Sequence, residues 1–339
     1  MSVASLPPTP TVSPALPLHR NLRVAIVTCA TIALLIVLTR YWPIVQGALH
    51  EISLHPTVLL AGPLLALCFI ACKGASLTAA CHAAHMPMTP RAGVRTFIEG
   101  TVIESISWPG KLMGDIYRAS VLPATSIIQR ASALVLWRIG TLLATLILVI
   151  TAAALTHNQL HTQSAWHHAA LLAAVITAAC IATWFIASRT HHLRAANLTG
   201  RRAFTAISRI TAYSLLATLA DLTAIAFFAA TIANVNALTF LPLFICASLI
   251  ASASTIPMAA GILDAGCYFA LTHSCGTTPE AATAIILCYR ALGPGITLAA
   301  GAASFLLVPA RTSLQSLQPA PPPTSQSQIP HHETHAPAT

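Results

Sequence analysis

Long apolar runs separated by short polar stretches dominate this chain. Eight runs are candidates for helical spans, at about Val24–Pro43, Pro56–Gly74, Ser132–Leu155, Ala169–Ser188, Ile210–Ala233, Thr239–Thr255, Met258–Leu271 and Ala281–Val308. About 20 apolar residues in a helix cross a hydrocarbon core roughly 30 Å thick. The pattern therefore predicts an all-α protein, a polytopic transmembrane helical bundle of about eight spans.

The two ends of the chain lack this pattern. Residues 1–19 are rich in Pro, Ser and Thr and have no basic segment before an apolar core, so they predict a disordered cytoplasmic leader rather than a signal peptide. Residues 311–339 are rich in Pro and His and predict a disordered tail. The transmembrane domain is expected at residues 20–310.

The basic residues predict the orientation of the spans. Arg20 and Arg23 precede the first span, Lys73 and others follow the second, and five arginines between 189 and 209 separate the fourth from the fifth. Cytoplasmic loops are enriched in Lys and Arg, so these segments are expected in the cytoplasm. The formal net charge of +9 follows from this topology, and no nucleic-acid partner is predicted.

One polar stretch interrupts the apolar pattern. The sequence ESISWPGKLMGDIYR (104–118) carries Glu104, Lys111, Asp115 and Arg118 around the breaker Pro109-Gly110, in a chain of which only 7% is charged. Both flanks are predicted to be cytoplasmic, so the stretch is expected to be a re-entrant or broken-helix element. Such backbone is tolerated at membrane depth where it lines a polar cavity. An interfacial loop is the alternative.

A similar pattern occurs again in the second half of the chain. Pro257, Gly261, Asp264 and then Arg290 within an apolar run parallel Pro109, Asp115 and Arg138. The spacing from Pro to Asp is 6 and 7 residues, and that from Asp to Arg is 23 and 26. Interrupted segments in two halves of a membrane protein indicate an internal repeat and a site at the repeat interface.

Other ionisable groups leave alternatives open. An arginine inside a span is costly, so Arg138 and Arg290 are expected to pair with carboxylates, to contact a substrate, or both. Asp221 is a lone acid in an apolar run, with three possible roles: a protonated core group, a partner for an arginine, or a proton-coupling site. The nine cysteines and fifteen histidines form no clear ligand motif, so no metal and no cofactor is predicted.

These residues resemble the transmembrane region of the lysylphosphatidylglycerol synthases, a flippase-like family of bacterial multi-pass proteins. That family has a P-G-[RK]-x-x-[GE]-[ED]-x-x-R segment followed by a helix with an embedded Arg, matched here by PGKLMGDIYR and Arg138. Its later P-x-x-G-G-x-G-x-x-E segment and Tyr-Arg helix are matched by PMAAGILDAG and by Tyr289-Arg290, with Asp264 in place of Glu. No counterpart of the family's soluble aminoacyl-transferring domain is expected, since a Pro-rich stretch follows Val308.

The resemblance implies lipid handling in the bacterial inner membrane without aminoacyl transfer. A translocator of polar lipids is the leading hypothesis, with its path lined by Glu104, Pro109, Gly110, Lys111, Asp115, Arg118, Arg138, Asp221, Gly261, Asp264, Tyr289 and Arg290. No GxxxxGK[ST] loop is present, so direct ATP use is not expected. The alternatives are an accessory component of a hopanoid-type lipid biosynthesis pathway, in contact with its enzymes, and a membrane-embedded transferase using Glu104 and Asp115.

Overall fold

The computed structural model describes residues 42–107, 110–123, 126–156, 200–253 and 261–307, and over these ranges the chain contains helices and no strand. The helices are α2 (Trp42–Leu54), α3 (Pro56–Ala83), α4 (Pro90–Ile106), α5 (Gly110–Val121), α6 (Ile127–Thr156), α9 (Gly200–Ala233), α10 (Ala237–Ala253), α11 (Ile262–Phe269), α12 (Pro279–Arg290) and α13 (Ile296–Leu307). Two π-helical turns, η2 (Ala270–Ser274) and η3 (Ala291–Gly295), continue α11 and join α12 to α13. The predicted leader and tail lie outside the described residues.

Four helical stretches of the described chain are long and apolar enough to cross a bilayer. They are Pro56–Ala83, Ile127–Ala152, Phe204–Ala233 and Pro279–Phe305, the last of which runs through α12, η3 and α13. The spans expected at Val24–Pro43 and Ala169–Ser188 fall almost entirely outside the described residues. The remaining two expected spans correspond to α10 and to α11 with η2, which are short helices. The 17 residues of α10 extend about 25 Å at 1.5 Å per residue, less than the core of a typical bilayer.

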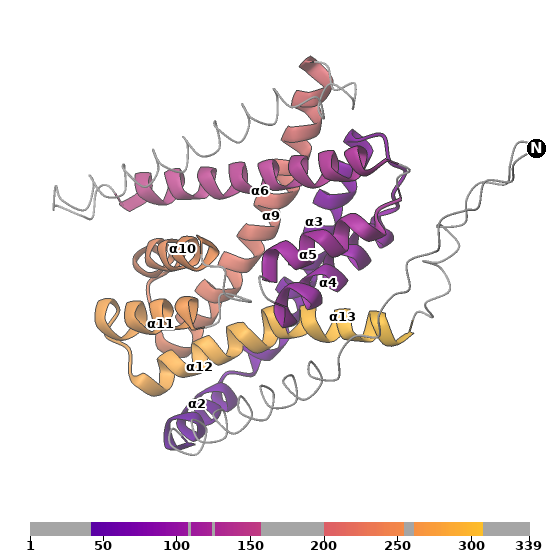
Figure 1. Cartoon of the computed structure of the whole chain (residues 1–339). Coiled ribbons are helices and arrows are strands. Elements are labelled where there is room, and N and C mark those ends of the chain that lie inside the picture. Colours follow the sequence, from indigo (N-terminus) through magenta and orange to yellow (C-terminus); the bar gives the residue numbers. More distant parts are fainter. Residues whose placement is uncertain (1–41, 108–109, 124–125, 157–199, 254–260, 308–339) are drawn as a thin grey trace, which may run out of the picture.

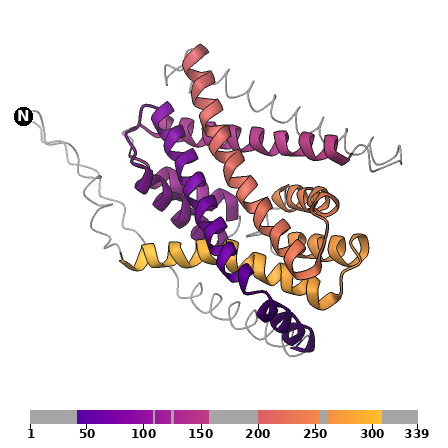
Figure 2. The same ribbon diagram turned by 180° about the vertical axis from the view of Figure 1, so that it is seen from behind.

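Helices α3 and α9 cross the middle of the molecule side by side (Figure 2). Small residues allow this close approach, and hydroxyl groups join the helices: Ser76 Oγ lies 2.9 Å from Ser214 Oγ and donates to the carbonyl of Ile210 at 3.3 Å. Thr141 of α6 lies 3.4 Å from the same Ser214 hydroxyl. Small residues and interhelical hydrogen bonds of this kind stabilise helix pairs in membranes, where the hydrophobic effect contributes little.

Two groups of helices flank this pair. Helices α4 and α5 lie to one side of α9 in Figure 1, and α10 and α11 lie to the other, while α12 and α13 pass beneath both. Each side has its own apolar core: Leu77, Phe97 and Leu136 belong to one, and Phe228, Phe244 and Ile285 belong to the other. The chain thus builds two halves that meet along α3 and α9.

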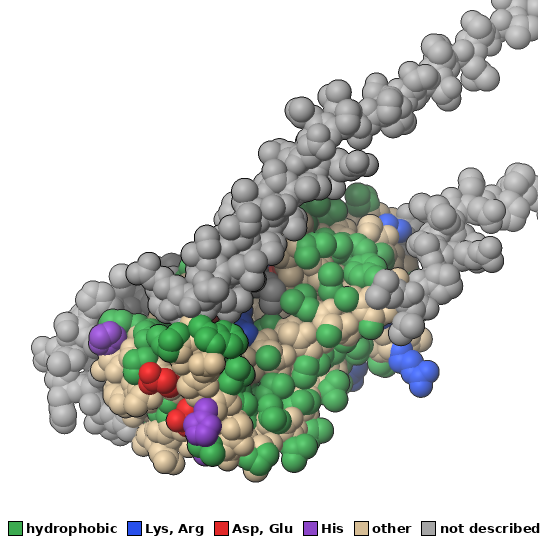
Figure 3. Space-filling model, turned by 90° about the horizontal axis from the view of Figure 1, so that it is seen from below, with side chains coloured by type: hydrophobic (Ala, Val, Ile, Leu, Met, Phe, Trp, Pro, Cys, Tyr) green, Lys and Arg blue, Asp and Glu red, His purple; other side chains and the backbone are tan. Residues whose placement is uncertain are grey.

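The outer surface carries the apolar side chains that a membrane protein needs. On α3, Leu59, Leu60, Leu64 and Leu67 are each about half exposed or more, with Leu60 at 73%. Figure 3 shows hydrophobic side chains over much of the visible face, with most of the charged ones near its two ends. Such a surface is typical of a protein in contact with lipid.

Three boundaries differ from those predicted. Helix α3 continues to Ala83 instead of ending near Gly74, because Ser76, Leu77 and Ala80 stay buried within the bundle. Residues 200–209, expected in a cytoplasmic loop, form the first turns of α9. The segment between the first two predicted spans, residues 44–55, is largely helix α2, which packs on α12.

Candidate functional site

The polar stretch identified in the sequence folds as a hairpin of two short helices, α4 and α5. Thr89 begins α4, since its Oγ1 accepts a hydrogen bond from Ala92 N and Pro90 occupies the first turn. The helix ends at Ile106, just before the Trp108-Pro109 dipeptide, and Pro109 itself lies outside the described residues. The 12 residues of α5 extend about 18 Å, which is too short to cross a bilayer.

Two glycines allow the hairpin to close. A Cβ at Gly114 would lie 2.9 Å from the carbonyl oxygen of Gly100, and a Cβ at Gly100 would lie 2.5 Å from Arg118 Nε. The space that Gly100 leaves empty is therefore occupied by the Arg118 side chain. The two helices approach so closely at this crossing that Gly100 and Gly114 leave no room for a side chain.

Arg118 is the most deeply buried charge of the hairpin, with 1% of its surface exposed. Its Nη1 donates to Asp115 Oδ1 at 2.9 Å, and its Nη2 donates to Glu104 Oε2 at 3.2 Å and to Thr101 Oγ1 at 3.3 Å. The guanidinium carbon also lies 5.1 Å from the centre of the Trp137 ring. A buried guanidinium requires such partners, because removing an unpaired charge from water is costly.

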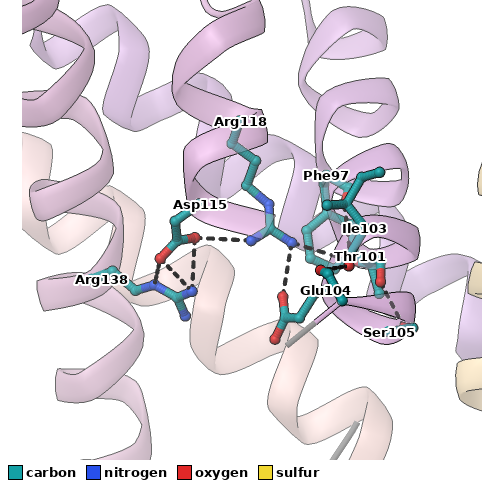
Figure 4. A network of polar contacts seen from close by, with 9 residues as sticks. Phe97, Thr101, Ile103, Glu104, Ser105, Asp115, Arg118 and Arg138 are labelled. Carbon is teal, nitrogen blue, oxygen red and sulfur yellow. Dashed lines mark hydrogen bonds and ion pairs between the residues drawn. The ribbon is translucent and has the colours of Figure 1, made fainter. Parts of the chain in front are cut away.

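Asp115 connects this arginine to Arg138 of α6 (Figure 4). Arg138 Nη2 donates to both carboxylate oxygens at 2.8 and 2.7 Å, and its Nε donates to Oδ2 at 3.0 Å. The Arg138 guanidinium lies 4.9 Å from the centre of the same Trp137 ring. One carboxylate and one indole therefore position two guanidinium groups, by ion pairing and by cation–π attraction.

The second motif forms an analogous ion pair in the other half. Arg290 Nε donates to Asp264 Oδ1 at 2.6 Å, while Asp264 Oδ2 accepts the backbone N–H of Gly261 at 3.2 Å. Gly261 has a φ of 83°, which favours glycine, and it begins α11. Asp264 and Arg290 are 26 residues apart in the sequence and are in contact in the structure. Asp115 and Arg138, 23 residues apart, are likewise in contact.

Asp221 pairs with a phenol rather than with an arginine. Tyr289 Oη donates to Asp221 Oδ2 at 3.0 Å and joins α9 to α12 next to Arg290. No ion pair of the described residues includes Asp221. Pairing with an arginine was one of the three roles left open for this acid, and the structure instead places a tyrosine beside it.

Both clusters face one cavity of about 350 Å³. Seven charged side chains line it, namely Lys73, Glu104, Lys111, Arg118, Arg138, Asp221 and Arg290. Asp115 and Asp264 are not in the lining, and each holds an arginine that is. Counting these two, five cations meet four carboxylates, an excess of one positive charge. Apolar side chains including Leu65, Phe69, Phe228 and Leu292 form the rest of the wall.

Lys73 was expected in a cytoplasmic loop, and this assignment is wrong. It lies within α3 and lines the cavity, because α3 extends beyond the predicted boundary. The chain has only two lysines, Lys73 and Lys111, and both line this cavity. The lysine interrupts the apolar run, which is why a hydropathy pattern alone ends the span near it.

The predicted site residues are thus largely brought together. Those that line the cavity are Glu104, Lys111, Arg118, Arg138, Asp221, Tyr289 and Arg290. Gly261 is the residue at which α11 begins, and Gly110 is the first residue of α5. Sequence reasoning missed Lys73, Phe97, Thr101 and Trp137; the position of Trp137, directly before Arg138, was the available signal.

A separate polar cluster anchors the hairpin from behind. Glu99 of α4 is 3% exposed and accepts hydrogen bonds from Arg95 Nε at 2.7 Å, Tyr117 Oη at 2.6 Å and Ser304 Oγ at 2.7 Å. Burial raises the pKa of Glu99, but these hydrogen bonds outweigh burial and lower the pKa below its ordinary value of 4.5. This carboxylate links α4, α5 and α13, so it fixes the hairpin against the last helix.

Comparison with protein-family models, with curated proteins and with solved structures returned no match to this chain. The resemblance of its two motifs to the lysylphosphatidylglycerol synthase transmembrane region therefore remains a prediction.

Proposed function

We propose that the protein binds polar lipids in the bacterial inner membrane and translocates them, with the headgroup passing through the cavity between the two ion-pair clusters. The observation that supports this most strongly is the position of five cationic side chains on one cavity of an otherwise apolar helical bundle. Charged groups at membrane depth are expensive and are typically retained on substrate or ion pathways.

The composition of the wall supports an amphiphilic ligand. One part of the wall is charged and another is made of side chains such as Leu65, Phe69 and Phe228. A lipid headgroup that enters such a cavity exchanges water for guanidinium and ammonium donors, while its tails remain among apolar groups. This exchange reduces the cost of moving a polar group through hydrocarbon.

The site geometry suits binding better than general-base catalysis. Glu104 and Asp115 both accept hydrogen bonds from Arg118, and Asp115 also accepts them from Arg138. These contacts occupy carboxylate oxygens that a general base would have to offer to a substrate proton. We therefore favour a transporter over a transferase, and we keep the accessory role in a lipid pathway as the outcome if no lipid moves.

Reconstitution of the purified protein into vesicles of phosphatidylglycerol and phosphatidylethanolamine tests the proposal. Fluorescent phosphatidylglycerol is placed in both leaflets, and its fluorophore is chemically reduced from outside the vesicle. The fraction of the lipid that becomes accessible to the reductant reports translocation. We expect faster loss of fluorescence than in protein-free vesicles. Thin-layer chromatography of the recovered lipid is expected to show no product, whereas a new product without movement supports the transferase. If the protein neither moves lipid nor forms a product, the transporter and the transferase are both contradicted, and the accessory role is left.

A further inference from the structure

Three hydrogen-bond donors of the cavity wall have no acceptor among the described residues, namely Arg118 Nε, the Lys73 ammonium and the Trp137 indole. Lys73 takes part in none of the ion pairs or hydrogen bonds of the described chain, and its closest ring contact is Phe69, with Nζ 5.8 Å from the centroid. The indole N–H of Trp137 is buried and likewise has no acceptor in the part of the chain described. Buried donors without acceptors are rare, so a ligand that supplies acceptors fits here.

The charges around Lys73 favour an anion. Asp221, Arg138, Arg118 and Glu104 all act electrostatically on the Lys73 ammonium, and two of the four repel it. The acids of the site are already engaged: Glu104 accepts from Arg118, and Asp221 accepts from Tyr289. The excess of one positive charge in the cavity is thus balanced by a ligand carrying one negative charge.

The cavity face of α3 indicates how such a ligand lies. Gly62, Leu65, Ala66, Phe69 and Lys73 all line the cavity and follow one another at helical spacing. The face is apolar up to Phe69 and ends at the ammonium. From Gly62 to Lys73 it extends about 16 Å at 1.5 Å per residue, close to half of a hydrocarbon core of about 30 Å.

We infer that the ligand is a lipid with a singly charged phosphodiester headgroup, whose phosphate binds Lys73 and whose acyl chain lies along the Gly62–Phe69 face of α3. A phosphodiester has one negative charge and unesterified oxygens that accept hydrogen bonds, and lysine binds phosphate as a point charge. Arg118, Arg138 and Arg290 are each held by a carboxylate, so they shape the field of the site while Lys73 is the phosphate anchor. This inference names the substrate class of the function proposed above and rests on it.

Native mass spectrometry of the detergent-purified full chain tests the assignment. The protein is offered phosphatidylglycerol or a glucosyl diacylglycerol with the same acyl chains, which has no phosphate. We expect the wild-type protein to retain phosphatidylglycerol at least about tenfold better. Lys73→Met should lose this preference, Lys73→Arg should keep it, and Arg209→Met, which removes an exposed charge of α9 outside the cavity, should leave it unchanged.

The outcomes separate this inference from the proposed function. Phosphatidylglycerol that is translocated with no dependence on Lys73, or no preference of the wild-type protein for the phosphate lipid, overturns the inference and leaves translocation standing. Binding that depends on Lys73 without translocation upholds the phosphate site and overturns the transporter. Binding of inorganic phosphate that depends on Lys73, with no lipid retained, overturns the lipid source. The wild-type comparison decides the preference even if Lys73→Met fails to fold.

Discussion

Arg138 Nη2 donates hydrogen bonds to both carboxylate oxygens of Asp115, at 2.8 Å to Oδ1 and 2.7 Å to Oδ2. The same Asp115 Oδ1 accepts a hydrogen bond from Arg118 at 2.9 Å. The two arginines differ in burial: the side chain of Arg118 is 1% exposed and that of Arg138 is 36% exposed. One carboxylate therefore joins a fully buried cation, expected to stabilise the fold, to a more exposed one, and both line the cavity.

This difference predicts unequal costs of removing the two charges. Arg118→Gln leaves Glu104 and Asp115 without their buried partner, so we expect a loss of about 3–5 kcal/mol in the free energy of unfolding. Arg138→Gln should cost about 1 kcal/mol or less, because its ion pair with Asp115, 36% and 26% exposed, is partly screened. Chemical unfolding in detergent, followed by circular dichroism, measures both. Equal losses would contradict the division of roles.

Gly100 is predicted to be essential for the position of Arg118. In Gly100→Ala the new methyl group would meet Arg118 Nε at 2.5 Å, and overpacking of this kind costs about 1–3 kcal/mol. Gly293→Ala is the matched control for stability, since a Cβ at that position meets no atom within 4 Å. Thermal melting in the same detergent should separate the two variants, and equal melting temperatures would show that the crossing is not tight.

Glu99 should make the stability of the hairpin depend on pH. Its pKa lies below 4.5 in the folded chain, so its contribution is present above about pH 4.5 and is lost as the pH falls through the lower folded-state value. Unfolding at pH 7 and at progressively lower pH measures this. Glu99→Gln should be less stable at pH 7 and should lose this part of the pH dependence. A variant with the wild-type pH profile would refute the role of Glu99.

The hairpin of α4 and α5 is predicted to enter and leave the membrane on one side. Topology reporters fused after His85, which follows α3, and after Pro123, which follows α5, should report the same compartment, since neither helix of the hairpin is a candidate span. Opposite compartments would mean that the segment crosses. Fusions after Leu155 and after Ser208 are still expected to report opposite sides, by the distribution of arginines.

The sequence predicted the helical class and the ion pairs better than it predicted the ends of the helices. An arginine inside an apolar run is costly, so pairing of Arg138 and Arg290 with carboxylates was among the expectations. The structure shows which acids they meet, Asp115 and Asp264. The position of Lys73 inside α3 could not be predicted from the sequence pattern, because a hydropathy pattern ends a span at a charged residue. Helix α3 instead continues past Lys73, where Ser76 and Ala80 pack within the bundle.

Some relationships depend on tertiary packing that the pattern of residues does not contain. The pairing of Tyr289 with Asp221 joins residues 68 positions apart on two helices, and no local rule relates them. The predicted internal repeat remains a prediction: the two Asp–Arg pairs are alike, but α4 and α5 form a hairpin while α11 continues into a π-helical turn.

Lipid translocation by variants of the two cavity arginines tests the central proposal most directly. Vesicles containing wild-type protein, Arg138→Gln, Arg290→Gln or the exposed control Arg209→Gln are compared for movement of fluorescent phosphatidylglycerol, with folded protein quantified by size-exclusion chromatography. We expect Arg138→Gln and Arg290→Gln to lower the rate by about tenfold or more, equivalent to about 1.4 kcal/mol, with folded protein retained and Arg209→Gln unchanged. Wild-type protein that moves lipid no faster than empty vesicles, or cavity variants that transport normally, would contradict a headgroup path through this cavity.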